Sequence, residues 1–336
     1  MRRVLLPHHI SQDPAPAGSV VHQFGGQSMG TGWTVRVAAL LSERMLDDVQ
    51  RGLQQRLDEV VGQMSHWEAS SDLGRFNRAP AGSWHELPAD FCKVLAYGLD
   101  VARDAGGAYD PCAGALVNLW GFGPERRHDQ PGFVVPDAQQ VALARARHAR
   151  ARVQLDRDAR RALQPGGVQL DLSAIAKGYA IDKLALYLEA RGLHHYLVEV
   201  GGELRGGGVK PDGQPWWVEL EQAAPDAPLD ELVLALHGLA VATSGDYRRY
   251  FESDERRYSH TIDPRSGAPI DNQLASVTVV HAQCMAADAW STALTVLGPD
   301  AGLALAEKLG LAARLVTRTA HGYEEHMSSH LRAMLE

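Results

Sequence analysis

The second half of the chain alternates apolar, strand-like segments with turns rich in glycine and proline, and this pattern limits the folds open to it. A strand is predicted at 33–37, and six more follow at 152–155, 168–172, 196–200, 216–220, 232–236 and 276–280. Runs of strands interrupted by only a few helices favour an α+β fold over a doubly wound parallel sheet.

Helical periodicity marks the remaining ordered segments. Apolar residues recur at helical spacing from Leu46 to Met64 and again over 90–106, and a shorter helix rich in alanine and arginine is expected after Asp137. The sequence shows no internal repeat and no long linker. We therefore expect a flexible N-terminal segment at 1–21, a single domain at 22–320 and a C-terminal tail at 321–336.

Composition excludes several classes of protein. The chain has 336 residues, of which 45% are hydrophobic and 22% charged, and its formal charge is −8, so a surface that neutralises nucleic-acid phosphate is not expected. The three cysteines have no spacing typical of a zinc site or a disulfide framework. No apolar run is long enough to cross a membrane, and none near the start resembles a signal peptide. The sequence as written predicts a cytoplasmic protein, or a periplasmic one if translation starts upstream.

Segment 284–298 is built like a buried helix, yet it contains Asp288 and Thr292 one turn apart. Positions four apart share a helix face, so a carboxylate and a hydroxyl project together from an apolar element. An unpaired buried carboxylate is costly, and Mg²⁺, which prefers oxygen ligands, would offset that cost. The alternative is that Asp288 pairs with an arginine or caps a backbone amide.

The segment 171–180, DLSAIAKGYA, is predicted to pass from a strand into a helix with Ser173 as N-cap. Free amides at such a turn attract anions, and Lys177 would add a positive charge to a phosphate site. The alternative is a helix that only packs against a sheet, with Lys177 in solvent.

His260 precedes an Asp-Pro turn at the end of a short predicted strand. Its ordinary pKa of about 6.5 suits a general base that accepts a proton from a hydroxyl, although a structural histidine held by hydrogen bonds is the alternative. Upstream, 242–247 is predicted as a strand end and a tight turn whose hydroxyls would face the same cleft, and a plain turn without a role in the site is the alternative.

Met29, Trp67 and Tyr109 lie at the ends of predicted elements, where they would stack on a planar heteroaromatic ligand or simply belong to the core. The motifs MGT at 29–31, MSHWEASSDLGRFN at 64–77, GGAYDPCAGALVNLWGFG at 106–123, DLSAIAKGYAID at 171–182, VEVGGEL at 198–204, ATSGDYRRYF at 242–251, YSHTIDPRSGAPI at 258–270 and AADAWSTAL at 286–294 resemble, in order, those of the ApbE family of FAD:protein FMN transferases.

The resemblance implies an α+β, T-fold-related structure with two interleaved lobes. It also implies cleavage of FAD with Mg²⁺, transfer of FMN through a phosphoester to a Ser or Thr of an acceptor flavoprotein, and release of AMP. The residues it assigns are Asp288, Thr292 and the backbone oxygen of Ala174 for Mg²⁺, His260 as the base, and Met29, Trp67, Ala108, Tyr109, Asp110, Asp171, Lys177 and Ile262 for the FAD pocket.

Two positions depart from the family pattern. Some relatives carry a further carboxylate where this chain has Ser291, and many begin with a signal and a lipid-anchoring cysteine that are not seen here. Other functions remain open at this point: an Mg²⁺-dependent FAD pyrophosphatase that uses water in place of the protein hydroxyl, or a flavin-binding protein without turnover.

Overall fold

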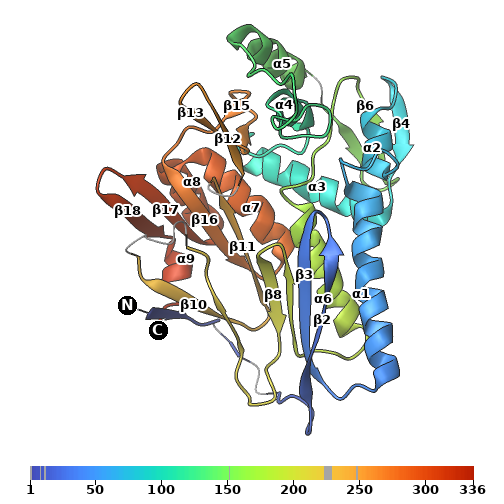
Figure 1. The fold of residues 1–336 in the computed structure, drawn as a ribbon, viewed down its shortest axis with the longest axis vertical. Helices are drawn as coiled ribbons and strands as arrows, with labels where there is room; N and C mark the ends of the chain where they lie inside the picture. Colours follow the sequence, from blue (N-terminus) through green and yellow to red (C-terminus); the bar gives the residue numbers. More distant parts are fainter. Residues whose placement is uncertain (1, 8, 11–12, 151, 223–228, 247–248) are drawn as a thin grey trace.

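The computed structural model describes residues 2–7, 9–10, 13–150, 152–222, 229–246 and 249–336. Its centre is an antiparallel sheet of eight strands in the order β18-β17-β16-β11-β8-β7-β3-β2 (Figure 1). These strands are β2 (Val20–Ser28), β3 (Thr31–Ala39), β7 (Tyr196–Val200), β8 (Glu203–Gly207), β11 (Leu239–Gly245), β16 (Leu274–His281), β17 (Ala312–Thr319) and β18 (Gly322–Met327). Alternating burial along β3 and β7 shows why they form: one set of side chains faces the main core.

Helices cover one face of this sheet. The main core lies between the sheet and the helices α1 (Glu43–Met64), α3 (Ala89–Asp104), α6 (Ala176–Glu189) and α7 (Cys284–Leu297). The apolar stripe of α1 and the nearly complete burial of α7 account for their places, since a helix that is apolar all round must be enclosed. The other helices are α2 (Asp72–Asn77), α4 (Gly114–Leu119), α5 (Ala138–Arg150), α8 (Pro299–Leu309) and α9 (Ser329–Arg332).

A second core lies on the opposite face of the large sheet, under a three-stranded sheet of order β1-β10-β9. Its strands are β1 (Arg2–Leu5), β9 (Trp216–Glu219) and β10 (Glu231–Leu236). A further sheet of order β4-β6-β5 lies beside α2, and two hairpins lie near α4 and α5 (Figure 1). They consist of β4 (Ser83–Glu86), β5 (Gln154–Asp156), β6 (Arg161–Gln164), β12 (Tyr250–Ser253), β13 (Arg256–Ser259), β14 (Ile262–Asp263) and β15 (Ala268–Pro269).

The α+β class predicted from the sequence is confirmed, and so are the predicted helices at α1, α3, α5 and α7. The predicted flexible N-terminal segment and the predicted C-terminal tail each contain a β-strand. β1 lies in the predicted flexible segment and pairs with β10, while β18 lies in the predicted tail and pairs with β17. Both are short strands that rely on partners distant in sequence, which local patterns do not reveal.

The strand predicted at 168–172 is wrong. This segment is extended but belongs to no sheet, apart from one isolated bridge between Ala113 and Gln169. The side chain of Asn77 takes the place of a partner strand, because its Oδ1 accepts from Leu170 N at 2.7 Å and its Nδ2 donates to Leu170 O at 2.9 Å. Among the described residues, no helix is both long and apolar enough to cross a membrane.

Candidate active site at the crossing of α6 and α7

Helices α6 and α7 approach each other with almost no space between their backbones. A Cβ atom built on Gly178 would lie 2.4 Å from the carbonyl oxygen of Cys284, so only glycine is compatible with this contact. The close approach brings the side chains of each helix to the first turn of the other. This crossing is the structural basis of the candidate site.

Each of the two helices supplies a carboxylate that caps its neighbour. Asp288 of α7 accepts a hydrogen bond from Gly178 N at 3.0 Å, and Asp182 of α6 accepts from Cys284 N and Met285 N, both at 2.9 Å. The amides near a helix start have no partner within the helix, so these bonds satisfy them. For one oxygen of Asp288, the alternative in which it caps a backbone amide is therefore confirmed.

Asp288 nevertheless carries an electrostatic cost in this position. Its side chain is buried, and burial together with the nearby Glu203 raises its pKa to about 8, against the opposing effects of Lys177 and the Gly178 amide. The ionised form of this carboxylate therefore needs additional positive charge. Such a group is a candidate ligand for a cation.

Lys177 is not in solvent, contrary to the alternative considered for its helix. Its ammonium group donates to the carboxylate of Glu203, which is only 5% exposed. Burial alone would lower the pKa of Lys177, but Glu203 and Asp288 outweigh this effect and raise it. Glu203 lies in the VEVGGEL motif at 198–204, but sequence reasoning assigned it no role, and it is the charged residue of the site that was missed.

Ser173 is not the N-cap that the sequence predicts. Helix α6 begins at Ala176, its cap position is Ile175, and the turn before it contains Ser173 and Ala174. The amide of Ser173 instead donates to Asp171 Oδ1 at 2.8 Å, and this local turn delays the start of the helix. Ala174 therefore lies in a turn directly before the amides that face Asp288.

Thr292 lies one turn beyond Asp288 on α7 and contacts the large sheet. Its Oγ1 is 3.1 Å from Ser244 Oγ of β11, and Ser244 is also 2.8 Å from Ser291 Oγ. The hydroxyl of the predicted strand end therefore does meet the helix. Residues 247 and 248 of the same predicted turn lie outside the described part of the chain.

His260 directly follows β13 and is fixed through its ring. Its Nδ1 lies 3.0 Å from the carbonyl oxygen of Arg249, so Nδ1 carries the proton and Nε2 is left as an acceptor. Burial, together with the positive charges of Arg249 and Lys177, lowers the pKa of His260 to about 4. The ring is therefore neutral at pH 7. Because the charge of Lys177 contributes to the lowered pKa, we infer that the ring faces the crossing of α6 and α7.

The residues assigned to the flavin pocket are dispersed around this centre. Ala108 and Tyr109 are buried, and the hydroxyl of Tyr109 has no hydrogen-bond partner among the described residues. Burial and then the charges of Asp288 and Asp171 raise the Tyr109 pKa, which places Tyr109 close to both. Ile262 is buried in a small apolar cluster that also contains Trp120.

Within the described ranges, no hydrogen bond or ion pair joins the assigned residues Asp110, Met29 and Trp67 to Asp288 or Lys177. Asp110 binds His148 at 3.2 Å and Arg152 at 3.0 Å; although burial would raise its pKa, these partners lower it. Met29 has φ +52° in the turn between β2 and β3, and Trp67 is 49% exposed.

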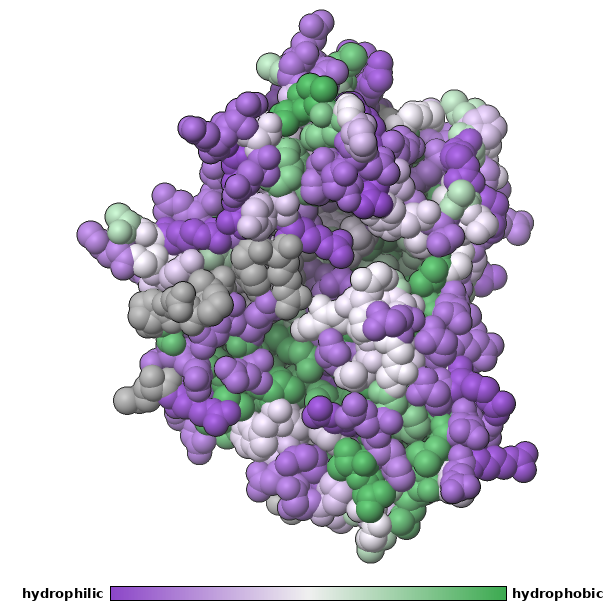
Figure 2. Space-filling model, viewed as in Figure 1, coloured by the Kyte–Doolittle hydropathy of each residue, from purple (hydrophilic) through white to green (hydrophobic). Residues whose placement is uncertain are grey.

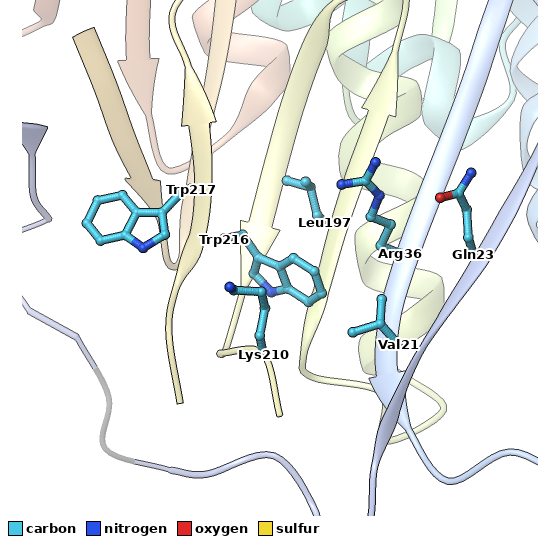
Figure 3. A pocket seen from close by; sticks show the side chains of 7 residues that line it. All are labelled: Val21, Gln23, Arg36, Leu197, Lys210, Trp216 and Trp217. Atoms are coloured by element: carbon cyan, nitrogen blue, oxygen red, sulfur yellow. The ribbon is translucent and has the colours of Figure 1, made fainter. Parts of the chain in front are cut away.

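Two grooves open on the face of the large sheet that is not covered by helices. The groove of about 400 Å³ in Figure 3 contains none of the predicted residues; it is lined by Val21, Gln23, Arg36, Leu197, Lys210, Trp216 and Trp217. The other, of about 650 Å³, lies beside the Met29 turn and is lined by Gly25, Gly26, Gln27, Thr31, Gly32, Trp33, Thr34, Glu199, Gly201 and Gly202. Figure 2 views the molecule from the same side as Figure 1 and shows a hollow near the centre of this face.

No group of three or more histidine, cysteine, aspartate or glutamate side chains in the described ranges is arranged to hold a metal ion. The residues that the resemblance assigns to the ion supply oxygens of a different kind: the Asp288 carboxylate, the Thr292 hydroxyl one turn along α7, and the backbone oxygen of Ala174 in the turn before α6. A mixed oxygen set of this type suits Mg²⁺, which keeps several water ligands, better than it suits zinc.

Comparison with known proteins gives consistent results. The model of the ApbE family matches residues 29–315. A "FAD:protein FMN transferase" of Vibrio cholerae is 36% identical over 310 residues, covering 92% of this chain and 91% of the relative, and one of Haemophilus influenzae is 36% identical over 326 residues, covering 94% and 92%. The crystal structure of the Pseudomonas stutzeri flavinyl transferase ApbE, in its apo form, is 38% identical, covers 94% of this chain and 97% of its own, and superposes with a TM-score of 0.84. The chain belongs to the ApbE family.

Proposed function

We propose that this protein is an Mg²⁺-dependent FAD:protein FMN transferase, which cleaves FAD and attaches FMN to a Ser or Thr of an acceptor flavoprotein with release of AMP. The relatives that cover most of the chain have this name. The observation that carries the proposal is the position of Asp288, one hydrogen bond from the first turn of α6 and beside Lys177. A carboxylate and a lysine at one point suit a cation and a diphosphate together.

Asp288, Thr292 and the backbone oxygen of Ala174 would hold the Mg²⁺ ion. The fit rests on the chemistry of this set, since all three atoms are oxygens and the buried Asp288 carboxylate requires positive charge to ionise. When bound, the ion would neutralise charge on the diphosphate oxygens. Lys177 would bind the same diphosphate.

Around this centre, Met29, Trp67, Ala108, Tyr109, Asp110, Asp171 and Ile262 would form the walls of the FAD pocket. The unpartnered hydroxyl of buried Tyr109 supports this assignment, because buried hydroxyls are normally hydrogen-bonded and a ligand atom would provide the missing bond. Trp67, with half of its surface exposed, is available for stacking on a planar ring.

The reaction proceeds by attack of the acceptor hydroxyl oxygen on the phosphorus on the flavin side of the diphosphate. A phosphoester bond forms, the bond from that phosphorus to the bridging oxygen breaks, and AMP leaves with the bridging oxygen. His260 Nε2 accepts the hydroxyl proton, because the Arg249 carbonyl holds the ring proton at Nδ1. Lys177 orients the diphosphate for this step.

The test is incubation of the protein with FAD, Mg²⁺ and a candidate acceptor flavoprotein, followed by denaturation and mass spectrometry. Transfer predicts one FMN covalently attached to a Ser or Thr of the acceptor and an equal amount of AMP. Free FMN and AMP without protein-bound flavin would mean an FAD pyrophosphatase. FAD retained unchanged in excess Mg²⁺ would mean a flavin-binding protein without turnover.

A further inference from the structure

Glu203 is a buried carboxylate at the centre of the candidate site, and the family resemblance assigns it no role. It is the first residue of β8 and follows Gly201 and Gly202, whose φ angles of +61° and +96° form the tight turn from β7. Its side chain is 5% exposed, and it accepts a hydrogen bond from the ammonium group of Lys177. The turn therefore places the negatively charged carboxylate of Glu203 against the ammonium group of Lys177.

Lys177 has two carboxylates within its electrostatic reach but pairs with only one of them. Glu203 and Asp288 both act on it, and the effect of Glu203 is the larger. In the described part of the chain, the direct ion pair is with Glu203, while the hydrogen bond recorded for the Asp288 carboxylate comes from Gly178 N. Lysine is a point charge on a flexible stem, so a change at Glu203 would release Lys177 to pair with Asp288.

An ammonium group on Asp288 would compete with a divalent cation for the same carboxylate. We propose that Glu203 is a positioning residue that holds Lys177 away from Asp288 and thereby leaves the Asp288 carboxylate available to a divalent cation. This inference rests on the proposed function, in which Asp288 is a cation ligand. It also explains why a site for a cation and an anion contains a second buried acid.

Glu199 provides a matched control for the loss of negative charge. It lies in β7 on the other side of the glycine turn, where it accepts from Thr34 Oγ1 at 3.2 Å and from Gly202 N at 2.7 Å. The ion pair of Lys177 is with Glu203 and not with Glu199. Glu199→Gln removes one carboxylate from the same region and keeps an oxygen that can accept from Gly202 N.

The experiment measures Mn²⁺ affinity by electron paramagnetic resonance, without FAD or acceptor, in a double-mutant cycle of Glu203→Gln and Lys177→Met. We expect Glu203→Gln to weaken Mn²⁺ binding about tenfold in the wild-type background, the order of effect of one close ion pair. In the Lys177→Met background, which has no ammonium group to compete, the same change is expected to alter affinity less than about twofold. Glu199→Gln is expected to change it less than about twofold in both backgrounds.

Equal weakening by Glu203→Gln in both backgrounds would overturn the inference, because Glu203 would then act through its own charge or through the fold. No weakening in either background would overturn it as well. If Glu203→Gln does not fold, Glu203→Asp, which retracts the charge by one methylene, replaces it with the same expected dependence on Lys177.

Failure of the inference and failure of the proposed function remain distinguishable. If the wild-type protein transfers FMN, but Glu203→Gln weakens Mn²⁺ binding equally in both backgrounds, only the role of Glu203 is contradicted. Wild-type protein without saturable Mn²⁺ binding contradicts both the cation assignment and the role of Glu203.

Discussion

The crossing of α6 and α7 and the arm that carries His260 are built in opposite ways. The crossing belongs to the main core, and its two helices cap each other through Asp182 and Asp288. The arm consists of the hairpins β12–β13 and β14–β15, whose strand residues are exposed or half-buried except for the buried Ser259 and Ile262. It is attached through aromatic contacts such as Trp120 with Tyr258, whose ring centroids are 5.5 Å apart, and through the bond from Trp120 Nε1 to Gly267 O at 2.8 Å.

This difference assigns the two halves of the proposed reaction to different parts of the molecule. The groups that would bind the cation and diphosphate are fixed by the packing of the core, where adding or removing one methyl group changes the stability of the protein. The group that would activate the acceptor hydroxyl lies on an arm whose apolar residues form a small cluster outside the main core. Changes at the crossing should therefore alter binding and stability, and changes at His260 should alter rate alone.

The largest expected effect is at Asp288. Asp288→Asn keeps the size of the side chain and an acceptor for Gly178 N, but it removes the charge that would hold Mg²⁺. Because a metal ion supplies several kcal/mol of charge stabilisation in the transition state, metal-dependent AMP release should fall by more than roughly 10⁴-fold. AMP is measured by chromatography, with the exposed Asp300 changed to Asn as control. Near wild-type release by Asp288→Asn would contradict the cation assignment.

The next effect is at His260. His260→Ala should slow FMN transfer by roughly two to four powers of ten, the usual scale of general base catalysis, while FAD affinity stays within about twofold. Single-turnover kinetics and a fluorescence titration with FAD separate the two quantities. His326→Ala on β18 is the control. A loss of FAD affinity equal to the loss of rate would mean that the His260 ring binds FAD rather than acting only as the base.

Gly178→Ala tests the contact between the helices. The new Cβ would lie 2.4 Å from the carbonyl oxygen of Cys284 and 2.8 Å from Asp288 Cβ, so the helices must separate. We expect the free energy of unfolding to fall by about 1–3 kcal/mol, the usual cost of overpacking. Gly62→Ala is the control, since nothing lies within 4 Å of its Cβ on α1 and the change should stabilise the helix slightly. Urea denaturation compares the two variants, and unchanged stability in Gly178→Ala would disprove the close contact.

The smallest expected effect is the pH dependence of the rate that arises from His260. Its pKa of about 4 lies below the ordinary value of 6.5, so the ring is neutral and able to accept a proton throughout the range above about pH 5. The rate limb due to this group should fall only as the pH decreases through about 4, and the His260-dependent part of kcat/KM should change less than about twofold between pH 6 and 8. A limb near pH 6.5 that disappears in His260→Ala would show that the ring is not held in this environment.

The functional side chains of α7 could be predicted from the sequence better than the residues that surround them. Asp288 and Thr292 could be assigned to one face because a buried helix has a regular period and a polar pair interrupts it. Glu203 could not be found in this way, since its contact with Lys177 joins residues 26 apart and depends on the β7–β8 turn. The error at 168–172 has a similar origin, because the side chain of Asn77, 93 residues from Leu170, replaces a strand.

The most direct test of the account is anomalous diffraction from crystals of this protein soaked with Mn²⁺. The account predicts an anomalous peak coordinated by Asp288, Thr292 and the carbonyl oxygen of Ala174, with Lys177 still paired to Glu203. A Mn²⁺ ion bound elsewhere, with Asp288 held only by the Gly178 amide, would contradict it.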